Sequence, residues 1–223
     1  FLLLVCALIT FAANLEAQVY TRILHPSEQI VDYIPWHIAE KPDAKLLAPP
    51  DVDATLAQDA VNNPINRIAI GRKTRLSPED GTFYHFGNYS IWKLTAQSSG
   101  ATYLNFDFSN LTLPEGSAMI IYSDANRMIH GPITAKQYRE QRYTSDVVAG
   151  EEATIEVFLP ENTVKLFDFT MNKFYYGIVP TMGGPNTKAY GAAAVCIPDI
   201  SCPEGAQWQL QADATCVILN DEE

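Results

Sequence analysis

Apolar and polar side chains alternate along several short stretches between about residue 66 and residue 179. Leu104, Phe106 and Phe108 lie two residues apart, and the same spacing recurs over Thr154–Leu159. A period of two places one set of side chains on one face of an extended strand. The pattern therefore predicts half-buried strands at Thr102–Phe108 and Thr154–Leu159. The side chains that should face inward in the second strand are Ile155, Val157 and Leu159.

Further stretches also have the composition of strands. Ala118–Tyr122 is apolar throughout, which is typical of a central strand. The other candidates are Arg67–Ile70, Tyr89–Thr95, Val164–Thr170 and Lys173–Val179. Turn-forming residues separate the candidates at Pro114–Gly116, Ser123–Asn126, Ala149–Glu151 and Pro160–Asn162. Several short strands without the helices that a parallel sheet needs predict an all-β fold, a β-sandwich over residues 66–179.

Residues 18–65 differ from the predicted sandwich because proline interrupts them repeatedly. The prolines are Pro26, Pro35, Pro42, Pro49, Pro50 and Pro64. Long helices and strands are disfavoured in such a segment. One short helix is predicted at Asp53–Val61, with Asp51 or Asp53 as its N-cap. We expect an irregular N-terminal arm that wraps a neighbouring part of the protein in extended form.

The first thirteen residues are apolar and uncharged. That length suits the apolar region of a signal peptide and is short for a membrane span of about 20 residues. Ala17 followed by Gln18 offers a cleavage point, so residues 1–17 are interpreted as a signal peptide of a secreted protein. A buried N-terminal helix or strand is the alternative. Since no Met or basic segment precedes Phe1, we expect the natural chain to begin earlier.

A composition change follows Val179. Pro180–Gly191 is rich in Gly, Pro, Thr and Asn, which is typical of an exposed linker that proteases can cut. We predict a cleavable linker at residues 180–188, with Lys188 and Ala189 on either side of the cut. The chain then ends in an apolar run and a polar tetrapeptide, Asn220–Glu223, which resembles a strand entering a turn. We expect the natural protein to continue beyond it.

Composition and charge narrow the possible functions. With 47% hydrophobic and 18% charged residues, the chain has enough apolar surface to build a core. Its 15 Lys and Arg against 26 Asp and Glu give a net charge of −11. That balance argues against nucleic-acid partners, which require cationic side chains at the phosphates. It also argues against binding to an anionic membrane surface after signal removal.

Three of the four cysteines lie near the C-terminal end, at Cys196, Cys202 and Cys216, and Cys6 lies in the predicted signal peptide. In a secreted protein these thiols should be oxidised. Cys196 and Cys202 could pair with each other or with other cysteines, and their spacing does not decide between these possibilities. A zinc site is disfavoured because the spacing is wide and no His lies nearby. No metal or other cofactor is predicted.

The string Cys196–Trp208, CIPDISCPEGAQW, resembles the amino terminus of mature lysyl endopeptidases, a family of secreted chymotrypsin-like serine proteases. In that family a Cys, five residues, Cys-Pro-Glu-Gly and a nearby Trp open the peptidase domain. Upstream strings are similar to the family's pro-region: Ile91–Leu94, Ser98–Ala101, Leu113–Gly116, Ile121–Ser123, Gly131–Thr134 and Gly150–Glu156. The resemblance covers about Asp59–Leu219, and the order of the strings makes it specific.

The resemblance implies that this chain is mainly a pro-region that assists folding of its own peptidase domain and inhibits it. Residues 189–223 would be the N-terminal fragment of a double β-barrel that acts on protein substrates. Cys196 and Cys202 would each form a disulfide with a cysteine beyond the chain end. A Lys-specific enzyme could mature itself at Lys188–Ala189, because Lys188 is the residue that its pocket would select.

The chain also departs from the family's pattern. Seven residues separate Lys188 from Cys196, more than the family suggests, and Cys216 stands where an apolar strand residue is usual. Only 35 residues follow Lys188 in this chain of 223, whereas a barrel protease needs roughly 200. We therefore expect no catalytic residue within this chain, and the cleavage specificity cannot be read from it.

The histidines and aromatic residues suggest no active site of their own. His25, His37, His85 and His130 stand in no metalloprotease or nucleophile motif, so packing or solvent contact is the favoured role. The aromatic residues of the predicted sandwich are expected in its core rather than on a ligand platform. They are Tyr84, Phe86, Tyr89, Trp92, Phe106, Phe108, Phe167, Phe169, Tyr175 and Tyr176.

Two classes of function fit these features. The first is the precursor of a secreted serine endopeptidase. The second is a secreted β-sandwich that binds carbohydrate or protein without catalytic activity, since a sandwich fold does not fix a function. The Cys196–Trp208 string after a cleavable linker favours the precursor, because a binding module has no need of it.

Overall fold

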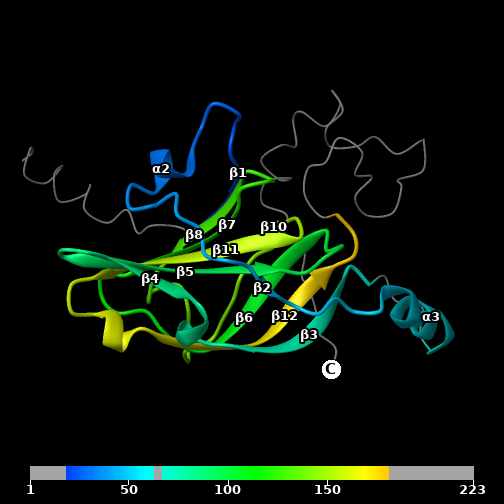
Figure 1. Ribbon diagram of the computed structural model, residues 1–223. Coiled ribbons are helices and arrows are strands. Elements are labelled where there is room, and N and C mark those ends of the chain that lie inside the picture. The colour runs from blue at the N-terminus through cyan, green and yellow to red at the C-terminus, as the bar shows by residue number, and fades with distance from the viewer. Residues whose placement is uncertain (1–18, 63–66, 181–223) are drawn as a thin grey trace, which may run out of the picture. The chain divides into compact units, whose positions relative to one another are not determined.

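The computed structural model describes residues 19–62 and 67–180 (Figure 1). By its contacts the chain divides into two compact units, Phe1–Ile178 and Val179–Glu223, and the elements below all belong to the first. The strands are β1 Tyr20–Ile23, β2 Lys45–Leu46, β3 Ala69–Leu76, β4 Thr82–Phe86, β5 Tyr89–Gln97, β6 Tyr103–Thr112, β7 Ala118–Ser123, β8 Met128–Ile133, β9 Tyr143–Thr144, β10 Val148–Ala149, β11 Glu152–Pro160 and β12 Asp168–Gly177. The helices are α2 Ile30–Tyr33, α3 Val52–Asn62 and the short 3-10 turns η2 Pro78–Asp80 and η3 Val164–Leu166.

The strands form two sheets. A seven-stranded sheet has the order β1-β8-β7-β11-β5-β2, and β4 also pairs with β5. A five-stranded sheet has the order β10-β6-β12-β3, and β9 also pairs with β6. Among the described pairs β2 runs parallel to β5, whereas the others are antiparallel. This architecture, with few helices, confirms the predicted all-β class.

The inner faces of the two sheets share one hydrophobic core. Trp92 of the seven-stranded sheet meets Phe169 of the five-stranded sheet edge to face, with ring centroids 5.3 Å apart. The indole N–H of Trp92 donates to the carbonyl oxygen of Pro78 at 2.8 Å, so the one polar atom of this side chain is satisfied. Leu104, Phe106 and Phe108 of β6 lie in the same core, as their spacing predicts.

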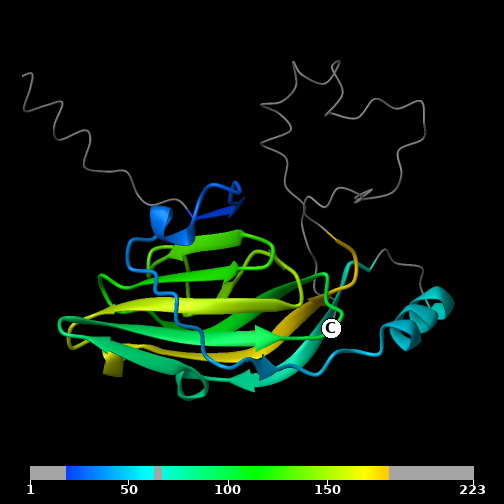
Figure 2. The same ribbon diagram turned by 45° about the horizontal axis from the view of Figure 1, so that its top comes forward.

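The outer face of the seven-stranded sheet is covered by the N-terminal arm, residues 19–50, as Figure 2 shows. Leu24 and Ile34 of the arm are buried in a second apolar cluster with Ile120, Tyr122 and Ile129 of the sheet. Because the arm covers this face, the central strands of the sheet are buried on both sides. The expectation that residues 18–65 wrap a neighbouring part of the protein therefore holds for residues 19–50, which also contribute the two short strands β1 and β2.

Several predicted elements match the structure closely. Ala118–Tyr122 lies in β7, which runs between β8 and β11, and Ile155, Val157 and Leu159 of β11 face the core. The predicted helix is α3, and Asp51 caps it by accepting a hydrogen bond from the Ala54 amide at 3.0 Å. These successes share a cause, because a regular apolar period or a capping side chain encodes each element locally.

Other local predictions were wrong. Val164–Thr170 is not a strand at its start, since Val164–Leu166 forms a 3-10 turn and β12 begins at Asp168. That strand continues without a break to Gly177, so two predicted strands are one. The strands β4 and β8 were not among the predicted elements. His130 lies inside β8, which continues through Gly131 and Pro132.

No helix among the described residues is long and apolar enough to cross a membrane. The apolar N-terminal run and the segment from residue 181 onward lie outside those residues, as do the domain boundaries predicted within them.

Candidate functional site

A buried pair of opposite charges stands at the centre of the arm-covered face. Lys93 of β5 and Glu156 of β11 are direct partners in the antiparallel register. Lys93 Nζ lies 3.1 Å from Glu156 Oε2, and neither side chain is exposed to solvent. Charged side chains are almost never fully buried unless they are paired. The pair therefore marks a site at which the sheet makes a specific contact.

The alternation of the strands explains why these charges point toward the arm. Trp92 and Leu94 face the core between the sheets, so Lys93 between them points to the opposite face. Ile155 and Val157 enclose Glu156 in the same way on β11. Each charge thus lies in the middle of a strand whose neighbouring side chains are apolar.

Residues of the arm complete the site, which we call the ionic cluster: His37, Ile38, Lys93, Tyr122 and Glu156. Lys93 Nζ donates to the Ile38 carbonyl oxygen at 2.5 Å and to the Tyr122 hydroxyl at 3.1 Å. The Ile38 amide donates to Glu156 Oε1 at 3.1 Å, and His37 Nδ1 lies 2.8 Å from Glu156 Oε2. The backbone and one side chain of the arm are therefore bound directly to the charged pair.

The electrostatics of the ionic cluster follow from its burial. Loss of solvent lowers the pKa of Lys93, and the carboxylate of Glu156 opposes this shift. Burial likewise raises the pKa of Tyr122, and the charge of Glu156 adds to the rise. Three acceptors surround Lys93 Nζ, matching the three N–H donors of an ammonium group. With its donors occupied and no solvent access, Lys93 is placed to fasten the arm rather than to act as a nucleophile.

A second polar group fastens the start of the arm, and we call it the His130 cluster: Thr21, His130, Tyr143 and Asp146. Thr21 belongs to β1 and His130 to β8, which pair directly in the sheet. His130 Nδ1 lies 2.8 Å from Thr21 Oγ1, and Thr21 Oγ1 donates to Asp146 Oδ2 at 2.6 Å. On the other side of the ring, Nε2 lies 2.6 Å from the Tyr143 hydroxyl and accepts from the Asp146 amide at 3.3 Å.

This arrangement suits a neutral imidazole with its proton on Nδ1. Burial lowers the pKa of His130, and the carboxylate of Asp146 opposes the shift. Protonation of Nε2 would place a donor against the Asp146 amide, which is itself a donor. The Nε2 acceptor, which exists only in the uncharged ring, therefore holds Asp146 in place, and Asp146 in turn accepts the hydrogen bond from Thr21 of β1.

A cavity of about 260 Å³ opens at the end of the sheet where β4 turns into β5. Its walls include His85, Phe86, Tyr89, Ser90, Glu161 and Asn162. His85 Nδ1 lies 2.9 Å from Ser90 Oγ, but no described carboxylate contacts the imidazole to complete a catalytic triad. The aromatic residues Phe86 and Tyr89 were expected in the core. They lie instead on the surface at this cavity, and Phe86 is 37% exposed.

The site residues predicted from the sequence fall outside the described part of the chain. They are Ala17, Gln18, Lys188, Ala189, Cys196 and Cys202. The structure therefore brings none of them together with the sites above, and they stay predictions. Within residues 19–62 and 67–180, no group of three or more His, Cys, Asp or Glu side chains could hold a metal ion.

The ionic cluster was missed by sequence reasoning, although a signal was present. Lys93 and Glu156 are single charges flanked on both sides by apolar residues, in strands assigned to the sandwich. If two strands are known to pair, opposite charges in their middle predict a buried ion pair. The pairing of β5 with β11 is a contact across about sixty residues, and no local pattern encodes it.

Comparisons with known proteins add little. No family model matches the chain. Among solved structures, a Bacillus thuringiensis Cry1Da tryptic core variant is similar over part of its length, with 7% sequence identity and a TM-score of 0.21. The similarity covers 47% of this chain and 23% of that protein's chain. A likeness at this level supports no inference about fold or function.

Proposed function

We propose that this chain is the pro-region of a secreted serine endopeptidase of the lysyl endopeptidase type, together with the first residues of the peptidase domain. The observation that carries the proposal is the Cys196–Trp208 string, CIPDISCPEGAQW, which follows a linker of cleavable composition. The pro-region would assist folding of the peptidase and inhibit it until the linker is cut.

The all-β body supports this proposal through the strings that resemble the family's pro-region. Two of them, Ile91–Leu94 and Gly150–Glu156, are distant in the sequence but supply the two halves of the buried charge pair, Lys93 and Glu156. Two short strings that resemble the family and also supply both partners of one buried charge pair are a more specific signal than two short strings that are unrelated in the structure. The finer assignment of the body as a β-sandwich pro-domain belongs to the same proposal.

Maturation would need two cuts, of which the second would release the described body. A signal peptidase would act between Ala17 and Gln18, and the peptidase itself would act between Lys188 and Ala189. Cys196 and Cys202 would then tie the new N-terminal segment of the double β-barrel to cysteines further along. Substrates of the mature enzyme would be proteins, with no cofactor required by an acyl-transfer triad.

The test expresses the gene with its native downstream coding sequence and compares the wild type with Lys188→Gln. We expect wild-type culture medium to contain a mature protein that begins at Ala189, and the variant to accumulate as an uncleaved precursor. N-terminal sequencing and mass spectrometry measure both. Lys165→Gln is the matched control, because Lys165 is an exposed lysine of the body. Normal maturation of Lys188→Gln would contradict self-cleavage at this bond.

A non-catalytic binding module is the second candidate function, and the cavity beside Phe86 and Tyr89 favours it. The two functions are not exclusive, since a pro-region can carry a binding site. Only the first accounts for the string that begins at Cys196.

A further inference from the structure

Four aromatic rings form a continuous row on the outer face of the seven-stranded sheet. Trp36 of the arm packs on Phe158 of β11 with ring centroids 5.8 Å apart, and Phe158 packs on Tyr89 of β5 at 5.5 Å. Tyr89 stacks on Phe86 of β4 at 5.0 Å, with an angle of 16° between the ring planes. None of the four is fully buried. We call these residues the aromatic row.

The alternation of the strands explains why the aromatic row lies outside the core. Tyr89 lies two positions from Ile91 and four from Lys93, so it shares their outward direction on β5. Phe158 has the same relation to Glu156 on β11. The arm covers Lys93 and Glu156 fully but leaves these rings partly exposed. Partly exposed aromatic rings in a contiguous row are unusual on a soluble protein and mark interaction sites.

The aromatic row ends at the cavity, which adds polar groups to it. Glu161 and Asn162 lie in the exposed turn after β11, and no described residue forms a hydrogen bond with either side chain. Ser90 and His85 also line the cavity and are hydrogen-bonded to each other. The cavity thus offers free carboxylate and amide groups beside the stacked rings of Phe86 and Tyr89.

The chemistry of these walls selects a class of ligand. Flat aromatic rings suit a ligand with an apolar face, and the free acceptors and donors suit hydroxyl groups around its rim. No Lys or Arg lines the cavity, and Glu161 adds a negative charge, so phosphate and carboxylate ligands are disfavoured. A volume of about 260 Å³ is below the range of about 300–1,000 Å³ for drug-sized ligands, which suits one small ring.

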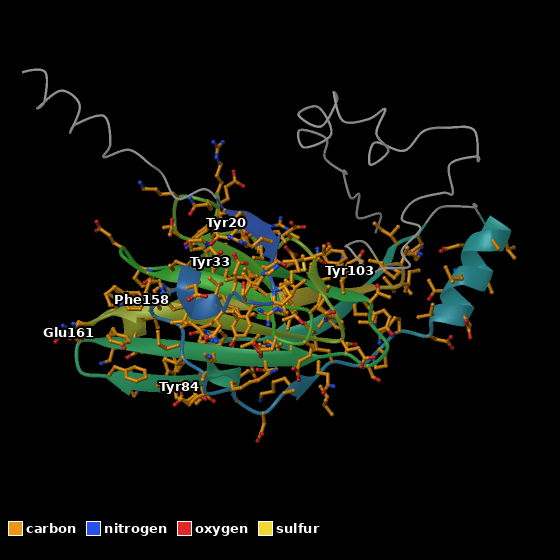
Figure 3. The ribbon with its side chains drawn as sticks, turned by 90° about the horizontal axis from the view of Figure 1, so that it is seen from above. Tyr20, Tyr33, Tyr84, Tyr103, Phe158 and Glu161 are labelled. Carbon is orange, nitrogen blue, oxygen red and sulfur yellow. The ribbon has the colours of Figure 1, made fainter. Side chains whose placement is uncertain are left out.

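The cavity and the end of β12 lie at different ends of the described body. The cavity adjoins Tyr89 at the start of β5, whereas Gly177, where β12 ends, bonds to Thr102 beyond the other end of β5. Nine residues of strand between them span about 30 Å. Figure 3 shows Phe158 and Glu161 at one end of the body and Tyr103 near the other. The chain therefore leaves the body far from the aromatic row.

We infer that the aromatic row and its cavity bind a neutral carbohydrate, with the terminal sugar in the cavity and the following sugars along the rings of Tyr89 and Phe158. Glu161 and Asn162 hydrogen-bond to hydroxyl groups of the terminal sugar. Phe86 and Tyr89 contact its apolar face. This function is independent of proteolysis and would hold the secreted protein at a polysaccharide surface.

The experiment titrates the full chain with three neutral probes, cellohexaose, hexa-N-acetylchitohexaose and laminarihexaose, by isothermal titration calorimetry. A hexamer of galacturonic acid serves as the anionic control. We expect saturable binding of at least one neutral probe and none of the anionic one. Loss of one ring or one hydrogen-bonding group should weaken binding about tenfold, equivalent to about 1.4 kcal/mol.

Three variants locate the site. Tyr89→Ala removes a ring of the aromatic row, Glu161→Gln removes a charged acceptor, and Asn162→Gly removes the amide. Glycine suits position 162 because Asn162 has a φ of 66°, so this variant keeps the turn unstrained. Tyr175→Ala, on β12 of the other sheet, is the matched control and should bind as the wild type does.

Two results would overturn the inference. The first is the absence of binding to all three neutral hexasaccharides at millimolar concentration by folded wild-type protein. The second is binding that Tyr89→Ala and Asn162→Gly leave unchanged, because the sugar would then lie elsewhere on the chain. Circular dichroism of each variant confirms that the all-β fold is retained, so a loss of binding is assigned to the site.

Discussion

At the centre of the seven-stranded sheet the two faces are both fully buried, but by different chemistry. On the inner face Trp92 and Leu94 pack against the other sheet, whereas Lys93 between them lies on the outer face in a hydrogen-bonded charge pair. All three side chains are at most 1% exposed. The inner contact is apolar and non-directional, so many apolar partners could satisfy it. The outer contact is directional, since it requires a carbonyl oxygen and an amide at fixed positions.

This difference explains how an arm with little secondary structure adopts one position. A buried charge pair does not of itself make a protein more stable than apolar residues of similar size would. It does penalise any arrangement that leaves either charge without partners. The ionic cluster therefore favours the arrangement in which His37 and the backbone of Ile38 cover Lys93 and Glu156.

The largest expected effect comes from removing one charge of the pair. Lys93→Met should lower the free energy of unfolding by about 3–5 kcal/mol, because Glu156 stays buried without its cation. Trp92→Ala should cost about as much through the cavity it leaves. Urea denaturation measures both. Hydrogen exchange then distinguishes the faces, because the Ile38 amide should exchange faster in Lys93→Met and stay protected in Trp92→Ala.

The double variant Lys93→Met/Glu156→Leu is the control for this prediction. Replacing both charges by apolar groups removes the unpaired charge, so most of the lost stability should return, while the arm should lose its fixed position. A double variant as unstable as Lys93→Met would show that the charge pair itself stabilises the fold. The claim that the charge pair fixes the position of the arm without adding to stability would then be wrong.

A smaller effect is expected from the His130 cluster, and it depends on pH. The pKa of His130 in the folded protein is lower than in the unfolded chain, where it is near 6.5, so unfolding takes up a proton in the window below about pH 6.5. Stability from this group is present above that pH and is lost as the pH falls through the window. Denaturant titrations from about pH 7.5 to about pH 5 should show this loss.

His130→Gln should reduce the pH dependence of stability, since the glutamine side chain does not titrate. His25→Gln is the matched control because it removes an exposed histidine that lies outside the His130 cluster. An equal slope in His130→Gln and the wild type would show that other groups cause the acid sensitivity. Faster hydrogen exchange of the β1 amides at low pH would show that the loss of stability begins at the start of the arm.

The smallest effect is expected from an uncharged pair on the same outer face. Thr95 and Thr154 are register partners whose hydroxyl oxygens lie 3.0 Å apart in a buried hydrogen bond. Thr95→Val should cost about 1 kcal/mol, measured by urea denaturation, because the Thr154 hydroxyl loses a partner. Thr95→Val/Thr154→Val should be nearly neutral. If Thr95→Val lowered the free energy of unfolding as much as Lys93→Met does, the expectation that an unpaired charge costs more than a lost hydrogen bond on this face would be wrong.

The sequence predicted those parts of the fold that a local pattern encodes. The period of two over Leu104, Phe106 and Phe108, and the Asp51 cap of α3, depend on neighbouring residues alone. The continuity of β12 was not predictable in the same way. Its register with β3 and β6 is irregular, and its apolar and polar side chains do not alternate uniformly. Pairing with these two strands keeps the segment extended, and no local pattern shows that pairing.

The candidate sites were less predictable than the fold because they are assembled from distant residues. The ionic cluster joins the arm, β5, β7 and β11, and the His130 cluster joins β1 to residues more than a hundred positions later. Phe86 and Tyr89 were interpreted as core residues because composition does not show which aromatic ring faces solvent. Only the pairing of β4 with β5 and the position of the arm show that these two rings lie in the aromatic row.

The measurement that tests the proposed function most directly is the coding sequence downstream of the codon for Glu223. The precursor account predicts an open reading frame of roughly 200 further residues. That frame should contain a His, an Asp and a Gly-x-Ser-Gly string in the order of a chymotrypsin-like triad, with cysteines to pair Cys196 and Cys202. A stop codon directly after Glu223 would contradict it and favour the second candidate function, a non-catalytic binding module.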